Sequence, residues 1–147
     1  MTTIYLGGPI AGCLDEEASG WRNQFMADLP TFSFKDPMVR DYRGIEDESV
    51  NEIVELDKED IDQSDIVLAY CWQVSVGTSM EVYYAWDLRF DGLGEGPGPF
   101  VLLVIPEGTR ISPWLRYHSD AIVTTLEEAQ ILIKDMETGT TNYLRGR

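Results

Sequence analysis

The fold is decided by the stretch Ile66-Val-Leu-Ala-Tyr-Cys-Trp-Gln-Val-Ser-Val-Gly-Thr-Ser-Met-Glu-Val-Tyr-Tyr-Ala85. Its first five residues are apolar on both faces of an extended chain, which is typical of a strand in a helix-covered parallel sheet. A loop that contains Gly77 follows, and the residues from about Thr78 to Phe90 have helical character. The stretch therefore predicts one strand–loop–helix unit of a layered α/β protein.

Strands and helices alternate in the rest of the chain as well. Apolar runs predict further strands at residues 3–7, 31–34, 100–105 and 121–124. Helical patterns predict helices at residues 16–29, 47–63 and 126–136, the last capped by Thr124 or Thr125. The connecting loops include residues 36–44 and 92–99. This order implies a doubly wound α/β sandwich with a five-stranded, mainly parallel sheet, helices on both faces and a single domain over residues 1–147.

The composition argues against several kinds of partner. The net charge is −15, from 26 acidic and 11 basic residues, which disfavours DNA, RNA and anionic membranes. With one histidine, His118, and no Cys/His cluster, we expect no metal site, and nothing in the chain suggests an organic cofactor. Cys13 and Cys71 are too few for a disulfide framework. Because no signal peptide or membrane-spanning run is visible, we expect a cytoplasmic protein with free thiols.

Glu81 is the first candidate for a catalytic residue. On the predicted helix it shares a face with Tyr84, Ala85 and Leu88, so its carboxylate should point inward. An unpaired buried charge is costly and shifts its own pKa, so an inward acid needs a reason. A structural reason is available, because Thr78 and Glu81 have the spacing of a capping box, in which Glu81 would bind the backbone N–H of Thr78.

Asp57 is the second candidate. It falls on the apolar stripe of the helix at 47–63, at positions 50, 53, 54, 57 and 61, whereas Asp60 and Asp62 fall largely outside it and should be solvated. The structural alternative is a boundary acid that reaches solvent. Both helices flank the strand at 66–70, and ligands bind at the carboxyl ends of such strands. Two carboxylates that converge there are the usual equipment for breaking a glycosidic bond.

At this point the chain resembles the nucleoside 2-deoxyribosyltransferase family. The resemblance is carried by Ile4-Tyr-Leu-Gly-Gly-Pro9, Leu56-Asp-Lys-Glu-Asp-Ile-Asp-Gln-Ser-Asp-Ile-Val-Leu-Ala69, Gly77-Thr-Ser-Met-Glu-Val-Tyr-Tyr-Ala85 and Phe100-Val-Leu-Leu-Val-Ile-Pro106. It implies a flavodoxin-like fold and a homo-oligomer, a dimer or higher, with shared active sites. It also implies that the substrates are nucleosides or nucleotides and free nucleobases.

The resemblance implies a role for each matching residue. Glu81 would be the nucleophile that attacks C1′ of a deoxyribose and forms a covalent glycosyl-enzyme, from which a second base takes the sugar. Asp57 would steer or protonate the nucleobase, and Tyr5 would lie near the nucleophile. The expected substrate contacts come from the strand ends and from the loop that contacts the base: Gly7, Gly8, Asp41, Ser75 and Gly77.

Two positions depart from the transferase pattern. Many transferases carry an acid where this chain has Ser75, and often an asparagine near Ala121. A serine at position 75 resembles the related nucleoside 5′-monophosphate N-glycosidases, because a hydroxyl and helix N–H groups accept a phosphate that a carboxylate would repel. Ser75 also fits a simple turn residue. Weaker candidates for phosphate contact are Arg22, Arg40, Arg43, Arg116, Tyr117 and His118, of which His118 is expected at the surface.

A third interpretation is a nucleotide-binding module without catalysis, against which the paired inward acids argue. The four tryptophans and seven tyrosines exceed what a core of this size needs, and both residue types are common at interfaces. Trp72, Trp86 and Trp114 are therefore the expected contacts between subunits.

Overall fold

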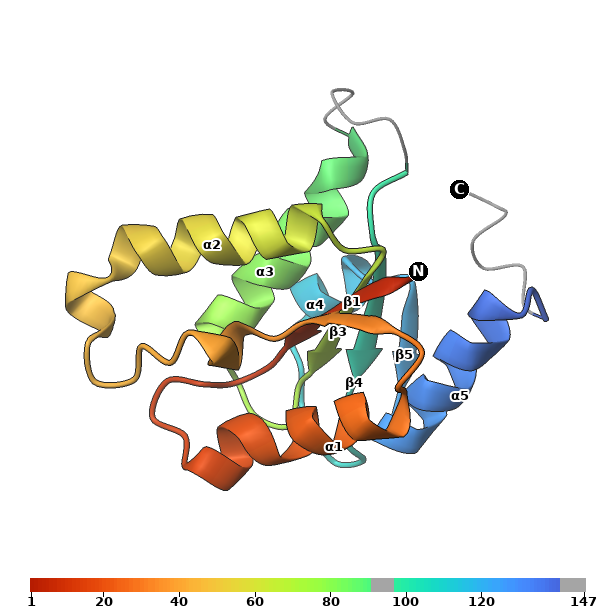
Figure 1. Ribbon diagram of the computed structural model, residues 1–147, viewed down its shortest axis with the longest axis horizontal. Coiled ribbons are helices and arrows are strands. Elements are labelled where there is room, and N and C mark those ends of the chain that lie inside the picture. Colours follow the sequence, from red (N-terminus) through yellow and green to blue (C-terminus); the bar gives the residue numbers. More distant parts are fainter. Residues whose placement is uncertain (91–96, 141–147) are drawn as a thin grey trace.

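The computed structural model describes residues 1–90 and 97–140. Five strands form one sheet in the order β2-β1-β3-β4-β5, and every neighbouring pair is parallel (Figure 1). The strands are β1 (Thr3–Gly7), β2 (Ser33–Lys35), β3 (Ile66–Tyr70), β4 (Phe100–Val104) and β5 (Ala121–Val123). This is the strand order of flavodoxin-like proteins, so the predicted fold is confirmed, with a sheet that is wholly parallel.

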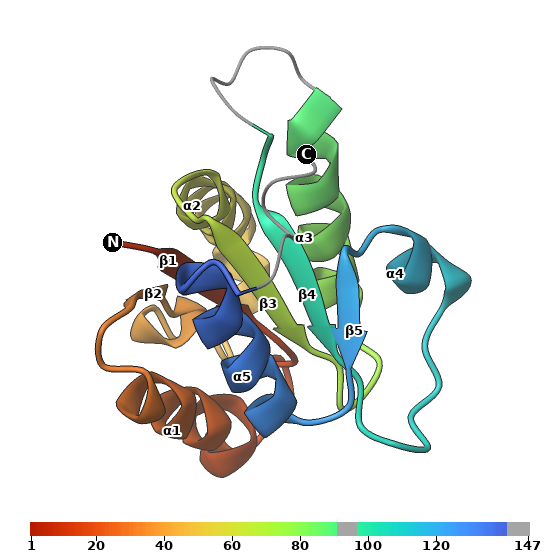
Figure 2. The ribbon, with the colours of Figure 1, turned by 90° about the vertical axis from the view of Figure 1, so that its right-hand side faces the viewer.

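Helices cover both faces of the sheet. They are α1 (Trp21–Asp28), α2 (Val50–Asp62), α3 (Val76–Asp87), α4 (Pro113–Tyr117) and α5 (Leu126–Glu137). Shorter helical turns are η1 (Glu16–Gly20), η2 (Pro37–Val39), η3 (Glu46–Glu48) and η4 (Leu88–Phe90). Figure 2 shows α1 and α5 on one face and α2, α3 and α4 on the other.

The core follows from the alternation of side chains along the strands. Ile66 and Leu68 of β3 pack with side chains of α1 and α5, whereas Val67 and Ala69 pack with side chains of α2, α3 and α4. All four residues are at most 2% exposed. This is why β3 is apolar on both faces, as the sequence predicted.

Several boundaries differ from the prediction. The helix expected at 16–29 is a π-helical turn, η1, followed by α1, and the strand expected at 31–34 begins only at Ser33. Helix α4 was not predicted; Ser112 caps it and Pro113 is its first residue. Of the two caps predicted for α5, Thr125 is the observed one, so that prediction is confirmed. Residues 91–96 of the loop expected at 92–99 lie outside the described residues.

The carboxyl ends of β1 and β3 lie side by side, with Gly7 opposite Ala69. They deliver the Gly7-Gly8 pair and the loop that leads into α3 to the same edge of the sheet, as the sequence predicted. Within residues 1–90 and 97–140, no helix is long and apolar enough to cross a membrane.

Candidate active site

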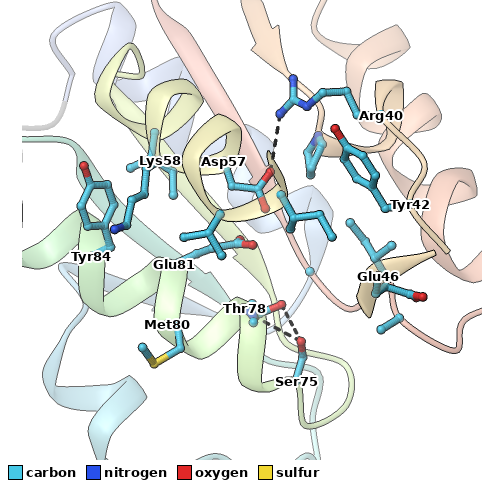
Figure 3. A pocket seen from close by; sticks show the side chains of 18 of the residues that line it. Arg40, Tyr42, Glu46, Asp57, Lys58, Ser75, Thr78, Met80, Glu81 and Tyr84 are labelled. Carbon is cyan, nitrogen blue, oxygen red and sulfur yellow. Dashed lines mark hydrogen bonds and ion pairs between the residues drawn. The ribbon is translucent and has the colours of Figure 1, made fainter. Parts of the chain in front are cut away.

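A cavity of about 590 Å³ opens at this edge of the sheet, between α2 and α3 (Figure 3). The loop after β1 and the loop between β2 and α2 complete its wall. Of the predicted site residues, five line this cavity: Gly8, Asp57, Ser75, Gly77 and Glu81. Other lining residues are Ile10, Pro37, Arg40, Tyr42, Arg43, Glu46, Ile53, Val54, Lys58, Ile61, Thr78, Met80, Tyr83, Tyr84 and Asp87.

Glu81 lies in the second turn of α3 and does not cap the helix. The helix begins at Val76, and its N-cap is Ser75, whose Oγ accepts hydrogen bonds from the backbone N of Thr78 at 3.3 Å and from Thr78 Oγ1 at 3.0 Å. The predicted capping box between Thr78 and Glu81 is therefore wrong, because the helix starts two residues earlier than expected. The carboxyl of Glu81 therefore takes no part in capping α3.

Glu81 reaches the end of β1. A Cβ atom built on Gly7 would lie 3.2 Å from Glu81 Oε2 and 3.3 Å from the carbonyl oxygen of Leu68, so a side chain at position 7 would crowd the carboxylate. The fully buried Tyr5 hydroxyl lies beside the same carboxyl group. Within residues 1–90 and 97–140, that hydroxyl has no partner in hydrogen-bond geometry. Gly7 therefore provides the space in which Glu81 sits, and Tyr5 lies behind it.

Burial makes both Glu81 and Asp57 harder to ionise. Burial raises the pKa of Glu81 to about 8, and the nearby charge of Asp57 adds to this, while the positive charge of Arg22 opposes it. Burial also raises the pKa of Asp57, and Arg40 opposes that rise. Tyr5 has a pKa well above its ordinary value, first because of burial and then because of Glu81 and Asp57. Neighbouring acids with raised pKa values are suited to acid–base work.

Asp57 is held from the side by Arg40. The Arg40 Nη2 atom lies 3.5 Å from Asp57 Oδ1 and donates a hydrogen bond of 2.7 Å to Asp60 Oδ2 (Figure 3 shows the contact with Asp57). Lys35 Nζ lies 3.5 Å from the other Asp60 oxygen. Asp60 is therefore buried, at 9% exposed, and the prediction that it is solvated is wrong, because two cations from outside its helix cover it. Asp62 is exposed and accepts a hydrogen bond from Tyr84.

Replacing Arg40 with glutamine is expected to lower the free energy of unfolding by about 2 kcal/mol, because Asp60 keeps only the longer contact with Lys35. The same change should make Asp57 harder to ionise, since the charge that opposes the rise of its pKa is lost. Urea unfolding checks the first effect. Arg116→Gln, at an exposed position, is the matched control; equal losses for the two variants would contradict the role given to Arg40.

The predicted substrate contacts Gly77, Gly8 and Asp41 differ in what surrounds them. Gly77 borders open space, with nothing within 4 Å of a Cβ atom placed on it, whereas a Cβ on Gly8 would lie 3.0 Å from Trp21. Asp41 is exposed, and its carboxylate binds Arg43, with a closest distance of 2.6 Å. Arg43 lowers the pKa of Asp41 to about 2. Asp41 thus orients Arg43, which lines the cavity in its place.

Two of the weaker candidates have structural roles. Arg22 is fully buried and donates hydrogen bonds to the carbonyl oxygens of Leu6, Ala18 and Gly8, so it is not exposed to a ligand. His118 was expected at the surface and is instead 9% exposed. Its ring stacks on Trp114 at 5.6 Å between centroids and also contacts rings from α3.

The sequence did not single out Tyr42, Glu46, Lys58 or Tyr84, all of which line the cavity. Tyr42 lies on an irregular loop and Glu46 begins the short turn η3, and neither stretch has a periodic pattern that shows which way its side chains point. Lys58 lies 5.3 Å from the ring centre of Tyr84, so these two residues form one corner of the cavity. Within the described parts of the chain, no group of three or more His, Cys, Asp or Glu side chains is arranged to hold a metal ion.

No protein-family model matches this chain, and no curated protein matches it either. Among solved structures, the chain is similar to a 2-deoxyribosyltransferase from the psychrotolerant bacterium Bacillus psychrosaccharolyticus. The likeness has a TM-score of 0.67 and covers 88% of this chain and 90% of that one, with 19% sequence identity. The two proteins therefore share their fold, the flavodoxin-like arrangement that was predicted from the sequence.

Proposed function

We propose that this protein is a nucleoside 2-deoxyribosyltransferase. It would cleave the N-glycosidic bond of 2′-deoxynucleosides through a covalent glycosyl-Glu81 intermediate and transfer the deoxyribosyl group to another nucleobase. One observation carries the proposal: the carboxyls of Glu81 and Asp57 come from two helices and point into one cavity at the ligand-binding edge of the sheet (Figure 3). The shared fold of a 2-deoxyribosyltransferase supports it.

The chemistry needs both acids. A Glu81 oxygen attacks C1′, the bond between C1′ and the base nitrogen breaks, and its electron pair leaves with the base. Protonated Asp57 gives its proton to the leaving base, so that a neutral base departs. In the second half, a nitrogen of the incoming base attacks C1′ from the face the first base left. Glu81 departs as a carboxylate and Asp57 takes up the proton, so atoms and charges balance.

The cavity suits such a substrate in size and lining. Its volume of about 590 Å³ is within the usual range for small-molecule sites. Apolar surface for a planar base comes from Ile53, Val54 and Tyr42. Asp57 and Arg40 place a hydrogen-bond acceptor beside a donor, which suits the polar edge of the base. The catalytic set in this proposal is Glu81, Asp57 and Tyr5. The substrate-binding set is Gly7, Gly8, Asp41, Ser75 and Gly77, in which Asp41 acts through Arg43.

The proposal predicts an unusual pH dependence. The reaction needs an ionised Glu81 and a protonated Asp57, so the acid pair must hold one proton. Because the pKa of Glu81 is raised to about 8, the pair loses that proton as the pH rises past about 8, and kcat/KM for base exchange should fall there. In Asp57→Asn the residual activity needs only an ionised Glu81, and a charge that raises its pKa is gone, so this activity should instead fall on the acid side, at a pH below about 8. A pH–rate profile of both proteins checks this. A fall at high pH that persists in Asp57→Asn would mean that Asp57 does not hold the proton.

A second candidate is a nucleoside 5′-monophosphate N-glycosidase, a hydrolase that releases a free base. It is favoured by the N-terminus of α3, where Ser75 and the open Gly77 line the cavity without a carboxylate. The capping of α3 by Ser75 offers a structural explanation of that serine, which is why we rank the transferase first.

One product assay separates the two candidates. The protein is incubated with a deoxynucleoside or its 5′-monophosphate, with and without a second free base. A new nucleoside that forms only with the acceptor supports the transferase. Base release that ignores the acceptor and strongly prefers the monophosphate supports the hydrolase and contradicts the transferase.

The proposal includes a single domain over residues 1–147, a place in the cytoplasm and a homo-oligomer with shared active sites. Exposed aromatic side chains support the oligomer: Trp114 is 71% and Tyr117 is 73% exposed, and Tyr117 contacts Trp86 of α3, the helix that carries Glu81. Trp72 and Trp86 are half-buried. Light scattering of the purified protein tests this, and a monomer at assay concentration would contradict it.

A further inference from the structure

A second cavity, of about 500 Å³, lies on the opposite face of the sheet from the catalytic one. It is bordered by η1, by the start of α1, by the end of β3 and by the loop that follows β3. Three aromatic residues line it, Trp21, Tyr70 and Trp72, together with two acids, Glu16 and Glu17. None of these residues takes part in the proposed reaction.

The three aromatic residues, called the cage below, line the cavity, and Trp21 and Tyr70 also pack against the hydrophobic core. Trp21 and Tyr70 meet edge to face, with 5.1 Å between ring centroids and an angle of 78° between their planes. Both are only partly buried, as is Trp72. The guanidinium carbon of Arg22 lies 4.6 Å from the ring centre of Trp21, so this indole already binds one cation. The faces of aromatic rings carry partial negative charge, which attracts cations.

Glu16 adds a full negative charge. A Cβ built on Gly20 would overlap the carboxyl of Glu16, so this carboxyl folds back over the glycine, into the space that a side chain there would fill. Across residues 1–90 and 97–140, Glu16 forms neither a hydrogen bond nor an ion pair, whereas Glu17 Oε1 accepts a hydrogen bond of 2.8 Å from the backbone N of Leu14. The carboxylate of Glu16 thus faces the cavity without a cation of its own.

We propose that this cage binds a small organic ammonium ion, such as a quaternary ammonium head group. Aromatic rings and a carboxylate that line one cavity are the combination that recognises such ions. The net charge of −15 also attracts cationic ligands. The site goes beyond the proposed transferase reaction and does not depend on it. The residue that connects the two cavities is Gly8, which lines the catalytic cavity and packs against Trp21 of the second cavity.

Calorimetric titration of the whole protein with choline tests the proposal. The comparison ligand is the uncharged isostere of choline, in which carbon replaces the nitrogen. We expect saturable binding of choline and about tenfold weaker binding of the isostere, because the isostere keeps the shape and loses the cation–π attraction. A lysine-trimethylated peptide forms a second arm. Binding of choline alone assigns the site to a free small cation, and binding of the peptide alone assigns the same head group to a protein chain.

Matched variants locate the binding. Trp72→Ala should weaken choline binding about tenfold and Glu16→Gln about threefold. Trp114→Ala and Glu48→Gln, at exposed positions elsewhere, should leave it unchanged. Glu81→Gln should also leave it unchanged, which separates the cage from the catalytic cavity. Equal binding of choline and its isostere, the absence of saturable binding of any cation, or full affinity in Trp72→Ala would overturn the proposal.

Discussion

Replacing Glu81 with glutamine is expected to lower kcat for base exchange by at least about 10³-fold, because an amide cannot attack C1′. The variant should fold at least as well as the natural protein. Burial raises the pKa of Glu81 in the folded protein to about 8, above the ordinary value of 4.5, so the folded state holds this proton more tightly than the unfolded state. The contribution of Glu81 to stability therefore falls as the pH rises from about 4.5 to about 8.

The Glu81→Gln variant has no buried carboxyl to ionise, so it avoids this loss of stability at high pH. Above pH 8 we expect its free energy of unfolding to exceed that of the natural protein by about 1 kcal/mol, the usual scale of a trade-off between stability and activity. Kinetic assays and denaturant unfolding at two pH values measure both effects. Glu55→Gln, an exposed position on α2, is the control and should change neither. Base exchange at the natural rate in Glu81→Gln would contradict a catalytic role for Glu81.

Replacing Gly7 with alanine is expected to lower kcat by about 10²-fold, because a catalytic group displaced by a fraction of an ångström loses its attack geometry. The new methyl carbon would lie 3.2 Å from Glu81 Oε2, and the backbone oxygen of Leu68 at 3.3 Å prevents it from moving away. The carboxylate, as the more mobile partner, should shift. KM should change much less than kcat, since the cavity wall that Gly8 provides is kept.

Gly77→Ala is the matched control for this change. Both are glycines in the predicted substrate-binding set, but nothing lies within 4 Å of a Cβ at position 77. Alanine is also the better helix former within α3. We expect Gly77→Ala to keep most of its activity and its stability. Equal activity of Gly7→Ala and the natural protein would show that Glu81 is not held against β1 during the reaction.

Reliable predictions came from the periodic parts of the chain. Strand β3 and the two inward acids follow from patterns of period two and period 3.6, which depend only on neighbours along the chain. Asp57 and Glu81 were found in this way, before any tertiary contact was known. Gly7 and Gly8 were found because parallel strands bring their carboxyl ends to one edge.

The errors concern contacts between segments that are distant in sequence. Asp60 was expected in solvent because helical spacing carries no information about Arg40 and Lys35, which reach it from the preceding strand and loop. His118 was expected at the surface because its place in the sequence does not show that rings from α3 and α4 cover it. Helix α4 is too short to show a period, although its Ser112-Pro113 start was a usable signal.

A covalent deoxyribosyl group on Glu81 underlies the whole proposed reaction, and mass spectrometry can detect it. The protein is mixed with a 2′-deoxynucleoside without an acceptor base, quenched in acid and digested. We expect a peptide that carries one deoxyribosyl group on Glu81, which disappears when an acceptor base is added before the quench. Base exchange that proceeds without such an adduct, or an adduct on another residue, would refute the role of Glu81 as the nucleophile.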